Sequence, residues 1–172
     1  MEKEVLRRLD TFGRVVVPKD MRQRLFIADG DPVTVSFEKN SIVLRPFVPL
    51  TEMDHFFSLC IQTARRSNLS LVITSRTEVL YSFAKDMIQG IPIPGTISAL
   101  ITSRKVHDVH ESGIPIVQGS RYRVQAVYPI VSYGELYGAI VPVNDSGAAL
   151  TEEQHQKLSF LRDLIAEEVN AN

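Results

Sequence analysis

The first 24 residues of the chain concentrate side chains that can bind phosphate groups and nucleic-acid bases. Residues 5–24 carry six basic and only two acidic side chains, although the net charge of all 172 residues is −1. A guanidinium group is a planar fork of N–H donors, which suits both phosphate oxygens and base edges. The alternative is an ordinary solvated sheet face, but a dense basic cluster on a near-neutral chain favours nucleic acid. We therefore expect DNA to be contacted by Arg7, Arg8, Arg14, Lys19, Arg22 and Arg24.

Short strands and one helix are expected to position these basic side chains. Gly13 can supply the positive φ of a turn at residues 10–13, and Pro18 ends strand pairing because it has no N–H to donate. Strict alternation of apolar and polar residues over 33–37 is typical of a half-buried strand, and Lys39-Asn40 marks a turn into a further strand. The expected elements are strands over residues 4–9 and 14–17, a helix over residues 19–26, and strands over residues 33–37 and 41–45.

This first segment is too short to bury an adequate core by itself. A chain of about 45 residues usually needs a disulfide, a metal or a partner to be stable. Cys60 is the single cysteine, which excludes an intrachain disulfide framework and a multi-cysteine zinc site. Pairing of two copies would supply the missing burial, so we expect an obligate homodimer.

The basic segment resembles a known DNA-binding family. The run Gly13-Arg14-Val15-Val16-Val17-Pro18-Lys19, followed by Arg22, is similar to the core of the AbrB-type swapped-hairpin domain. In that family two chains interleave their hairpins into a β-barrel and present arginines to duplex DNA. The resemblance therefore implies DNA contacts by Arg7, Arg8, Arg14 and Arg22.

One position departs from the pattern of that family. Related sequences usually carry a second arginine directly after the position of Arg22, whereas this chain has Gln23 there and Arg24 one residue later. On a helix this shift rotates the charge by about 100°.

Charge and composition divide the chain into two domains. Residues 1–50 carry nine basic and seven acidic side chains, whereas residues 51–172 carry ten and thirteen. Two prolines between residues 46 and 50 favour a stiff extended connection. We expect an AbrB-type domain over residues 1–47, a linker over residues 48–52 and a second domain over residues 53–172.

The second domain is expected to be α+β, with helices packed on an antiparallel sheet. Thr51 and Thr151 are candidate helix N-caps, because a hydroxyl can accept a hydrogen bond from a free N–H of the first turn. The expected helices cover residues 51–67, 97–105 and 151–170, and the expected strands cover residues 69–74, 79–83, 121–131 and 135–143. The first and last helices carry enough apolar surface to pack on the sheet and on another subunit.

Two segments of the second domain resemble a GAF-type sensor domain. They are Val127-Tyr128-Pro129-Ile130 and residues 134–141, where GAF domains often carry a hairpin with a glycine at a close approach between strands. An AbrB-type head joined to a GAF-like body is the arrangement of SpoVT-type regulators of sporulation, and the chain resembles that family. The resemblance implies a transcription regulator that binds double-stranded DNA and allows for an unidentified small-molecule effector. With the second apolar interface, we expect a homotetramer.

Residues 107–111 combine two imidazoles and two carboxylates, so a metal site or a hydrolytic His-Asp pair has to be weighed. On a strand, His107 and His110 would point to opposite faces, which disfavours joint metal binding. We expect an exposed loop or edge strand there and no metal.

No other feature predicts catalysis. Cys60 lies on the apolar stripe of a predicted helix and is expected to be a buried hydrophobe, and GAF-like sulfoxide reductases need several cysteines. The phosphate-binding, nucleophile-elbow and zinc-protease motifs are absent from the sequence. We expect neither enzyme activity nor a cofactor. The tyrosines could pack in the core, form an interface or line a ligand pocket; they are Tyr81, Tyr122, Tyr128, Tyr133 and Tyr137.

The apolar runs, such as residues 126–131, are far shorter than the roughly 20 residues of a membrane span, and no secretory leader is recognisable, so a cytoplasmic protein is expected.

The rival function is that of an antitoxin, because AbrB-type folds also form the N-terminal domains of antitoxins in toxin–antitoxin pairs. Antitoxins usually follow that head with a short, partly disordered tail rather than a second folded domain.

Overall fold

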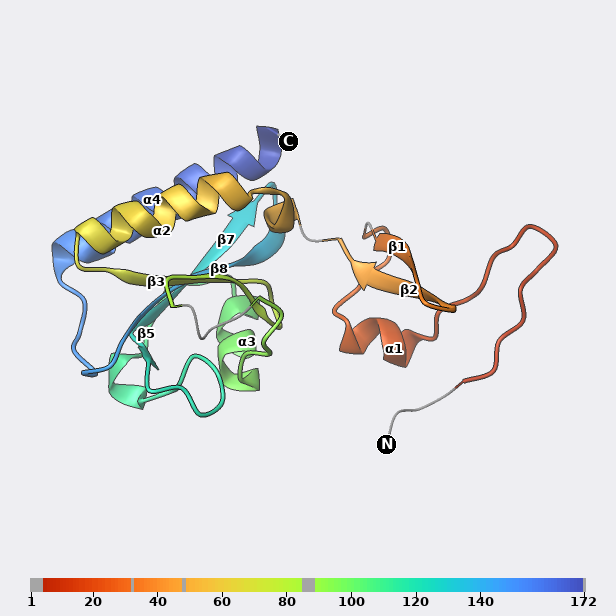
Figure 1. The fold of residues 1–172 in the computed structure, drawn as a ribbon, viewed down its shortest axis with the longest axis horizontal. Helices are drawn as coiled ribbons and strands as arrows, with labels where there is room; N and C mark the ends of the chain where they lie inside the picture. Colours follow the sequence, from red (N-terminus) through yellow and green to blue (C-terminus); the bar gives the residue numbers. More distant parts are fainter. Residues whose placement is uncertain (1–4, 32, 48, 85–88, 172) are drawn as a thin grey trace. The chain divides into compact units, whose positions relative to one another are not determined.

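The computed structural model describes residues 5–31, 33–47, 49–84 and 89–171, and the chain divides into two compact units (Figure 1). The first unit is Met1–Phe47 and the second unit is Val48–Asn172. The first unit contains α1 (Lys19–Arg24), β1 (Val33–Glu38) and β2 (Ser41–Pro46). These three elements confirm the helix and the second strand pair expected from the sequence.

Strands β1 and β2 form an antiparallel hairpin with one apolar face. Lys39 has a φ of +52° in the two-residue turn, and the register pairs Val35 with Leu44 and Phe37 with Ile42. Because directly paired residues share a face, these four side chains lie together, whereas Arg45 and Glu38 lie on the other face and form a salt bridge of 2.6 Å. Val35, Phe37 and Ile42 are 62%, 76% and 75% exposed. The apolar face of the hairpin is therefore uncovered in the single chain.

The strands predicted on either side of the basic turn are not formed. Between residues 5 and 18 the described chain contains a turn but no strand, and residue 4 lies outside the described residues. The turn itself is as predicted: the Gly13 N–H donates to the Asp10 carbonyl at 3.1 Å, and Gly13 has a φ of +76°. An isolated two-stranded ribbon is marginal in water, and Leu6 and Val16 in this segment are largely exposed. A strand pair here would need additional surface to pack against.

Lack of a core is general in the first unit. Over residues 5–31 and 33–47 no residue is buried, although the unit is rich in valine, leucine and phenylalanine. Burial of such side chains is the main driving force of folding. The described part of the first unit therefore leaves most of its available hydrophobic stabilisation unused.

The second unit is a sheet covered by helices on both faces. Its strands run in the order β4-β3-β8-β7-β5, all neighbours are antiparallel, and β6 also pairs with β8. Figure 1 shows α2 and α4 over one face of the sheet and α3 over the other. The elements are η1 (Pro49–Glu52), α2 (Asp54–Arg66), β3 (Ser70–Thr74), β4 (Val79–Ser82), α3 (Gly95–Thr102), β5 (His107–Asp108), η2 (His110–Ser112), β6 (Arg123–Val124), β7 (Ala126–Ser132), β8 (Glu135–Asn144) and α4 (Glu152–Ala171).

Alternating side chains of the strands supply two separate cores. In β3, Leu71 and Ile73 join the core beneath α2 and α4, whereas Val72 joins the core beside α3. In β7, Tyr128 joins the first core and Val127 the second. This period of two is what a strand buried on both faces requires. The α+β prediction is thus confirmed for the secondary structure, and the main helices and strands follow the predicted order, with the short strands β5 and β6 added between α3 and β7.

A glycine permits the closest approach between the central strands. A Cβ atom on Gly138 of β8 would lie 2.0 Å from the carbonyl oxygen of Thr74 in β3 and 3.1 Å from Leu50 Cδ1. Real Cβ atoms do not come so near a backbone oxygen, so only glycine fits here without a shift of the strand. The sequence-based expectation of a glycine at a close approach is met at this position.

Three details of the second unit differ from the predictions. Residues 49–52 form the 3₁₀ helix η1 with Leu50 fully buried, so they are not an extended linker, and residue 48 lies outside the described residues. Thr51 lies within η1 and is not the N-cap of α2, which follows Met53. Gln125 interrupts the strand predicted over residues 121–131 and separates β6 from β7. In each case packing in the folded unit overrides local sequence preference.

The predicted N-cap of the last helix is confirmed. The Gln154 N–H donates to Thr151 Oγ1 at 3.2 Å, and the Thr151 N–H donates to Gln154 Oε1 at 2.9 Å. This reciprocal capping box satisfies two N–H groups at the start of α4. No helix in the described part of the chain is long and apolar enough to cross a membrane.

Candidate functional site

The turn of the first unit presents one arginine in a fixed local setting. The side chain of Arg14 is 75% exposed, and its Nε donates to Asp10 Oδ2 at 2.7 Å. The guanidinium carbon of Arg14 lies 5.2 Å from the centre of the Phe12 ring, within the range of a cation–π contact. The arginine is thus held between a carboxylate and an aromatic ring while its outer end faces solvent.

The carboxylate of Asp10 is fixed in turn by the backbone. Its Oδ1 accepts hydrogen bonds from the N–H groups of Phe12 at 2.9 Å and of Arg14 at 2.8 Å. The backbone N–H of Arg14, followed by the Arg14 side chain, lowers the pKa of Asp10 from its ordinary value because both stabilise the charged form. Neither Asp10 nor Phe12 is among the residues that the sequence predicts to take part in DNA binding.

The remaining predicted contacts are spread over two other segments. Arg22 of α1 forms an ion pair with Asp29 in the loop that follows the helix. Lys19 and Arg24, also in α1, are exposed. Arg7 and Arg8 are exposed before the turn, where the Arg7 Nη1 donates to the Leu6 carbonyl at 3.1 Å. The structure therefore places all six basic side chains at the surface or partly exposed, in the turn, in α1 and before the turn.

Comparison with known proteins shows a similarity of the first unit to one protein family. Residues 6–49 match the sequence profile described as "Antidote-toxin recognition MazE, bacterial antitoxin". The first unit is therefore similar to MazE-type domains. The chain is also similar to Stage V sporulation protein T of Bacillus subtilis (strain 168), with 36% identity over 53 residues. That alignment covers 30% of this chain and 30% of the relative.

These matches support the AbrB/MazE-type and SpoVT-type resemblance. The profile match includes the basic turn and α1, and neither match is long enough to span the second unit. The GAF-like interpretation of the second unit consequently stays a prediction.

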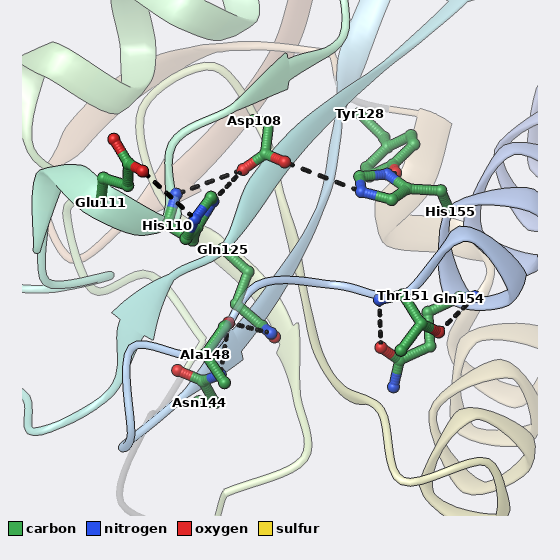
Figure 2. Close-up of polar contacts among 10 residues, drawn as sticks. All are labelled: Asp108, His110, Glu111, Gln125, Tyr128, Asn144, Ala148, Thr151, Gln154 and His155. Atoms are coloured by element: carbon green, nitrogen blue, oxygen red, sulfur yellow. Dashed lines mark hydrogen bonds and ion pairs between the residues drawn. The ribbon is translucent and has the colours of Figure 1, made fainter.

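The second unit joins four polar side chains from separate elements (Figure 2). Asp108 of β5 lies between two imidazoles: its Oδ1 is 2.6 Å from His110 Nδ1, and its Oδ2 is 3.7 Å from His155 Nε2 in α4. The phenol of Tyr128, in β7, forms a hydrogen bond with His155 Nδ1. The cluster ties the start of α4 to the edge of the sheet.

Charges in this cluster shift two pKa values in opposite directions. Burial raises the pKa of Asp108, but the hydrogen bonds from His110 and the charges of His110 and His155 more than offset this and lower it. The Asp108 hydrogen bond raises the pKa of His110. Burial raises the pKa of Tyr128 to about 12, so this buried phenol stays protonated and is no nucleophile at neutral pH.

The cluster predicts a pH-dependent stability for the second unit. A histidine with a raised pKa stabilises the fold below its unfolded pKa of about 6.5, and this contribution is lost as the pH rises through the folded pKa. Asp108 remains charged throughout that range because its pKa is lowered. We expect the free energy of unfolding to fall between pH 6 and pH 8, and to fall less in Asp108→Asn.

Urea unfolding followed by tyrosine fluorescence at several pH values would measure this effect. The chain has no tryptophan, and all five tyrosines lie in the second unit, so the signal reports that unit. His55→Gln, on the exposed side of α2, is the matched control. Equal pH dependence in the wild type and Asp108→Asn would contradict the prediction.

His107 and Cys60 have structural surroundings. His107 lies in the edge strand β5, with its Nε2 2.6 Å from Ser103 Oγ, and does not share the Asp108 contact of His110. Among the described residues no group of histidine, cysteine and acidic side chains could hold a metal ion. Cys60 is buried, and burial raises its pKa to about 11, as expected for a hydrophobic rather than a reactive thiol.

The tyrosines divide between the core and the surface. Tyr128 is in the core, whereas Tyr133 at the tip of the β7–β8 hairpin is almost fully exposed. Tyr81 contributes to a shallow cavity of about 210 Å³ between α2 and β4. Its other lining residues are Ser58, Ile61, Gln62, Arg65, Ser82 and Phe83.

Proposed function

We propose that this protein is a DNA-binding transcription regulator of the AbrB/SpoVT type. In this proposal two copies of the first unit intertwine and bind duplex DNA through Arg7, Arg8, Arg14 and Arg22, with Lys19 and Arg24 nearby. The observation that carries the proposal is an outward-facing basic turn in a unit that matches the MazE profile and whose described residues include no buried side chain. Such a regulator acts in the cytoplasm, where the DNA is.

The uncovered apolar face of β1 and β2 supports the homodimer. Val35, Phe37 and Ile42 would each gain roughly 1.5–3 kcal/mol if a partner covered them completely. A second copy offers the same face, so symmetric pairing would cover both. Residues 4–9 and 14–17 could then pair between chains, which would complete the swapped-hairpin barrel that a single chain lacks.

The charge of the first unit supports a DNA partner. Basic side chains bind the phosphate backbone, and base edges are read by planar donors such as arginine. Arg14 has that chemistry and projects from a turn whose backbone is fixed by Asp10 and Gly13. In a dimer the turn would occur twice, so two arginines could reach one duplex.

Salt-dependent binding to an AT-rich duplex, followed by fluorescence anisotropy, tests the proposal. Each neutralised phosphate steepens the log–log salt dependence by about 0.9, so we expect a slope of several units for the dimer. Arg14→Ala should weaken binding about tenfold or more. A bidentate contact between an arginine and a base changes the affinity by at least that factor.

Arg45→Ala is the matched control, since it also removes one positive charge from the first unit. Arg45 is paired with Glu38 and is not among the proposed contacts. Its affinity should stay within a small factor of the wild type. A flat salt response of the wild-type protein would overturn the DNA proposal.

For the second unit we propose a GAF-like domain that joins dimers into a tetramer. Phe160 and Leu164 lie one turn apart on α4 and are 71% and 38% exposed, and Leu59 on α2 is half exposed. These side chains support an apolar contact on the outer surface of α2 and α4. The cavity at Arg65 and Gln62 is where a small effector could bind.

A second candidate function follows from the description of the matching profile, which is that of an antitoxin. In that case a small toxin would bind to the chain. The second unit, with two cores and helices on both faces of a sheet, differs from the short tail expected of an antitoxin. Co-purification of a small toxin with the full chain would favour this alternative.

A further inference from the structure

We propose that Asp10 is a positioning residue that makes DNA recognition by Arg14 sequence-selective. This inference rests on the proposed function, in which Arg14 contacts DNA. An acidic side chain at a DNA interface would ordinarily oppose binding, because it repels the phosphate backbone. Because Asp10 holds Arg14 within the turn, it instead strengthens binding to a duplex whose sequence Arg14 recognises.

Both oxygens of the Asp10 carboxylate are engaged. Oδ1 accepts from the backbone N–H groups of Phe12 and Arg14, at 2.9 and 2.8 Å, and Oδ2 accepts from Arg14 Nε at 2.7 Å. The backbone N–H of Asp10 also donates to the Arg14 carbonyl at 3.0 Å. The carboxylate is therefore oriented by the turn before it orients the arginine.

The hydrogen bond from Nε to Asp10 leaves the two terminal nitrogens of the guanidinium free to bind a ligand. Nη1 and Nη2 carry the remaining N–H donors, and these are the pair that can bind guanine O6 and N7 together or two phosphate oxygens. Phe12 stacks near the same group at 5.2 Å and limits its rotation further. An arginine held in this way loses less rotamer freedom when it binds than a free one.

The two roles of Asp10 predict changes of opposite sign. If Asp10 were only a negative charge, Asp10→Asn would tighten binding to every duplex. If Asp10 positions Arg14, the same substitution weakens binding to a preferred sequence and leaves binding to other sequences unchanged or tighter. Asparagine suits the test because its Oδ1 can still accept the two backbone hydrogen bonds of the turn, whereas its amide cannot accept from Arg14 Nε.

The experiment compares two DNA probes with the full-length protein. One probe is a duplex selected by the wild-type protein from a random-sequence pool, and the other is the unselected pool. Asp10→Asn should bind the selected duplex about tenfold more weakly and the pool at least as tightly as the wild type. Glu38→Gln is the matched control. It also neutralises a carboxylate that pairs with an arginine, since Glu38 lies 2.6 Å from Arg45, and neither residue is a proposed DNA contact.

The outcomes separate this inference from the function on which it rests. If Asp10→Asn and Glu38→Gln change both affinities equally, Asp10 has no positioning role. If Arg14→Ala binds the selected duplex like the wild type, the DNA contact of Arg14 fails instead, and with it the inference. Arg14→Lys, which keeps the charge but lacks Nε, should reproduce the loss of selectivity, and sedimentation should show that all variants keep the oligomeric state of the wild type.

Discussion

Gly138→Ala is expected to destabilise the second unit by about 3 kcal/mol or more. The added Cβ would lie 2.0 Å from the Thr74 carbonyl oxygen, which belongs to the backbone of the neighbouring strand and cannot turn away. Strand β8 would have to move away from β3. The buried side chain of Leu50, which is the other close neighbour of the added Cβ, would have to move as well. The loss corresponds to a fall of roughly 10 °C in the melting temperature.

Thermal unfolding followed by tyrosine fluorescence measures this effect in the second unit alone, since the first unit has no tyrosine. Gly95→Ala is the control. Gly95 is the first residue of α3, and a Cβ there would meet no atom within 4 Å. Its melting temperature should match the wild type or rise slightly, because alanine favours a helix. A Gly138→Ala protein as stable as Gly95→Ala would show that β3 and β8 are not packed this closely.

Val35→Glu is expected to abolish assembly of the first unit and to weaken DNA binding about 100-fold or more. Val35 lies in the middle of the apolar face of the hairpin, opposite Leu44. A charged carboxylate covered by a second copy would lose its hydration without gaining a partner, which is strongly unfavourable. Because the first unit has no buried residue in the described single chain, loss of the partner should unfold it.

Thr34→Glu provides a matched control one residue away. Thr34 is exposed on the polar face of the same strand, opposite Arg45. Sedimentation should show the wild-type oligomer for Thr34→Glu. For Val35→Glu it should show an oligomer of half that mass, because the second unit still associates when the first unit does not. If both variants assemble and bind DNA like the wild type, the apolar face is not the subunit interface.

Local patterns predicted the elements whose stability is local. Alternation over residues 33–37 predicted β1, and the turn at Lys39 and Asn40 predicted β2 after it. The threonine before two acidic residues predicted the start of α4. The same rules predicted strands next to the basic turn, where the structure has none. In the AbrB-type fold that the sequence resembles, two chains interleave their hairpins, and a single chain lacks that second copy.

Contacts between distant residues were beyond sequence reasoning. The cluster of Asp108, Tyr128 and His155 requires β5, β7 and α4 to be in place, and no spacing in the sequence indicates that arrangement. The pairing of Asp10 with Arg14 is different, because only four residues and a glycine turn separate them. An aspartate, a turn and an arginine in that order could have indicated the contact.

The place of β8 in the sheet has a consequence for synthesis of the protein. This strand lies between β3 on one side and β6 and β7 on the other, yet it is the last strand of the second unit to leave the ribosome. Residues 70–74 must therefore wait for residues 139–143 before their main partner exists. Folding that depends on such distant pairing is slow and leaves apolar strands open to other chains. The nascent second unit should therefore depend on chaperones more than the short elements that precede it.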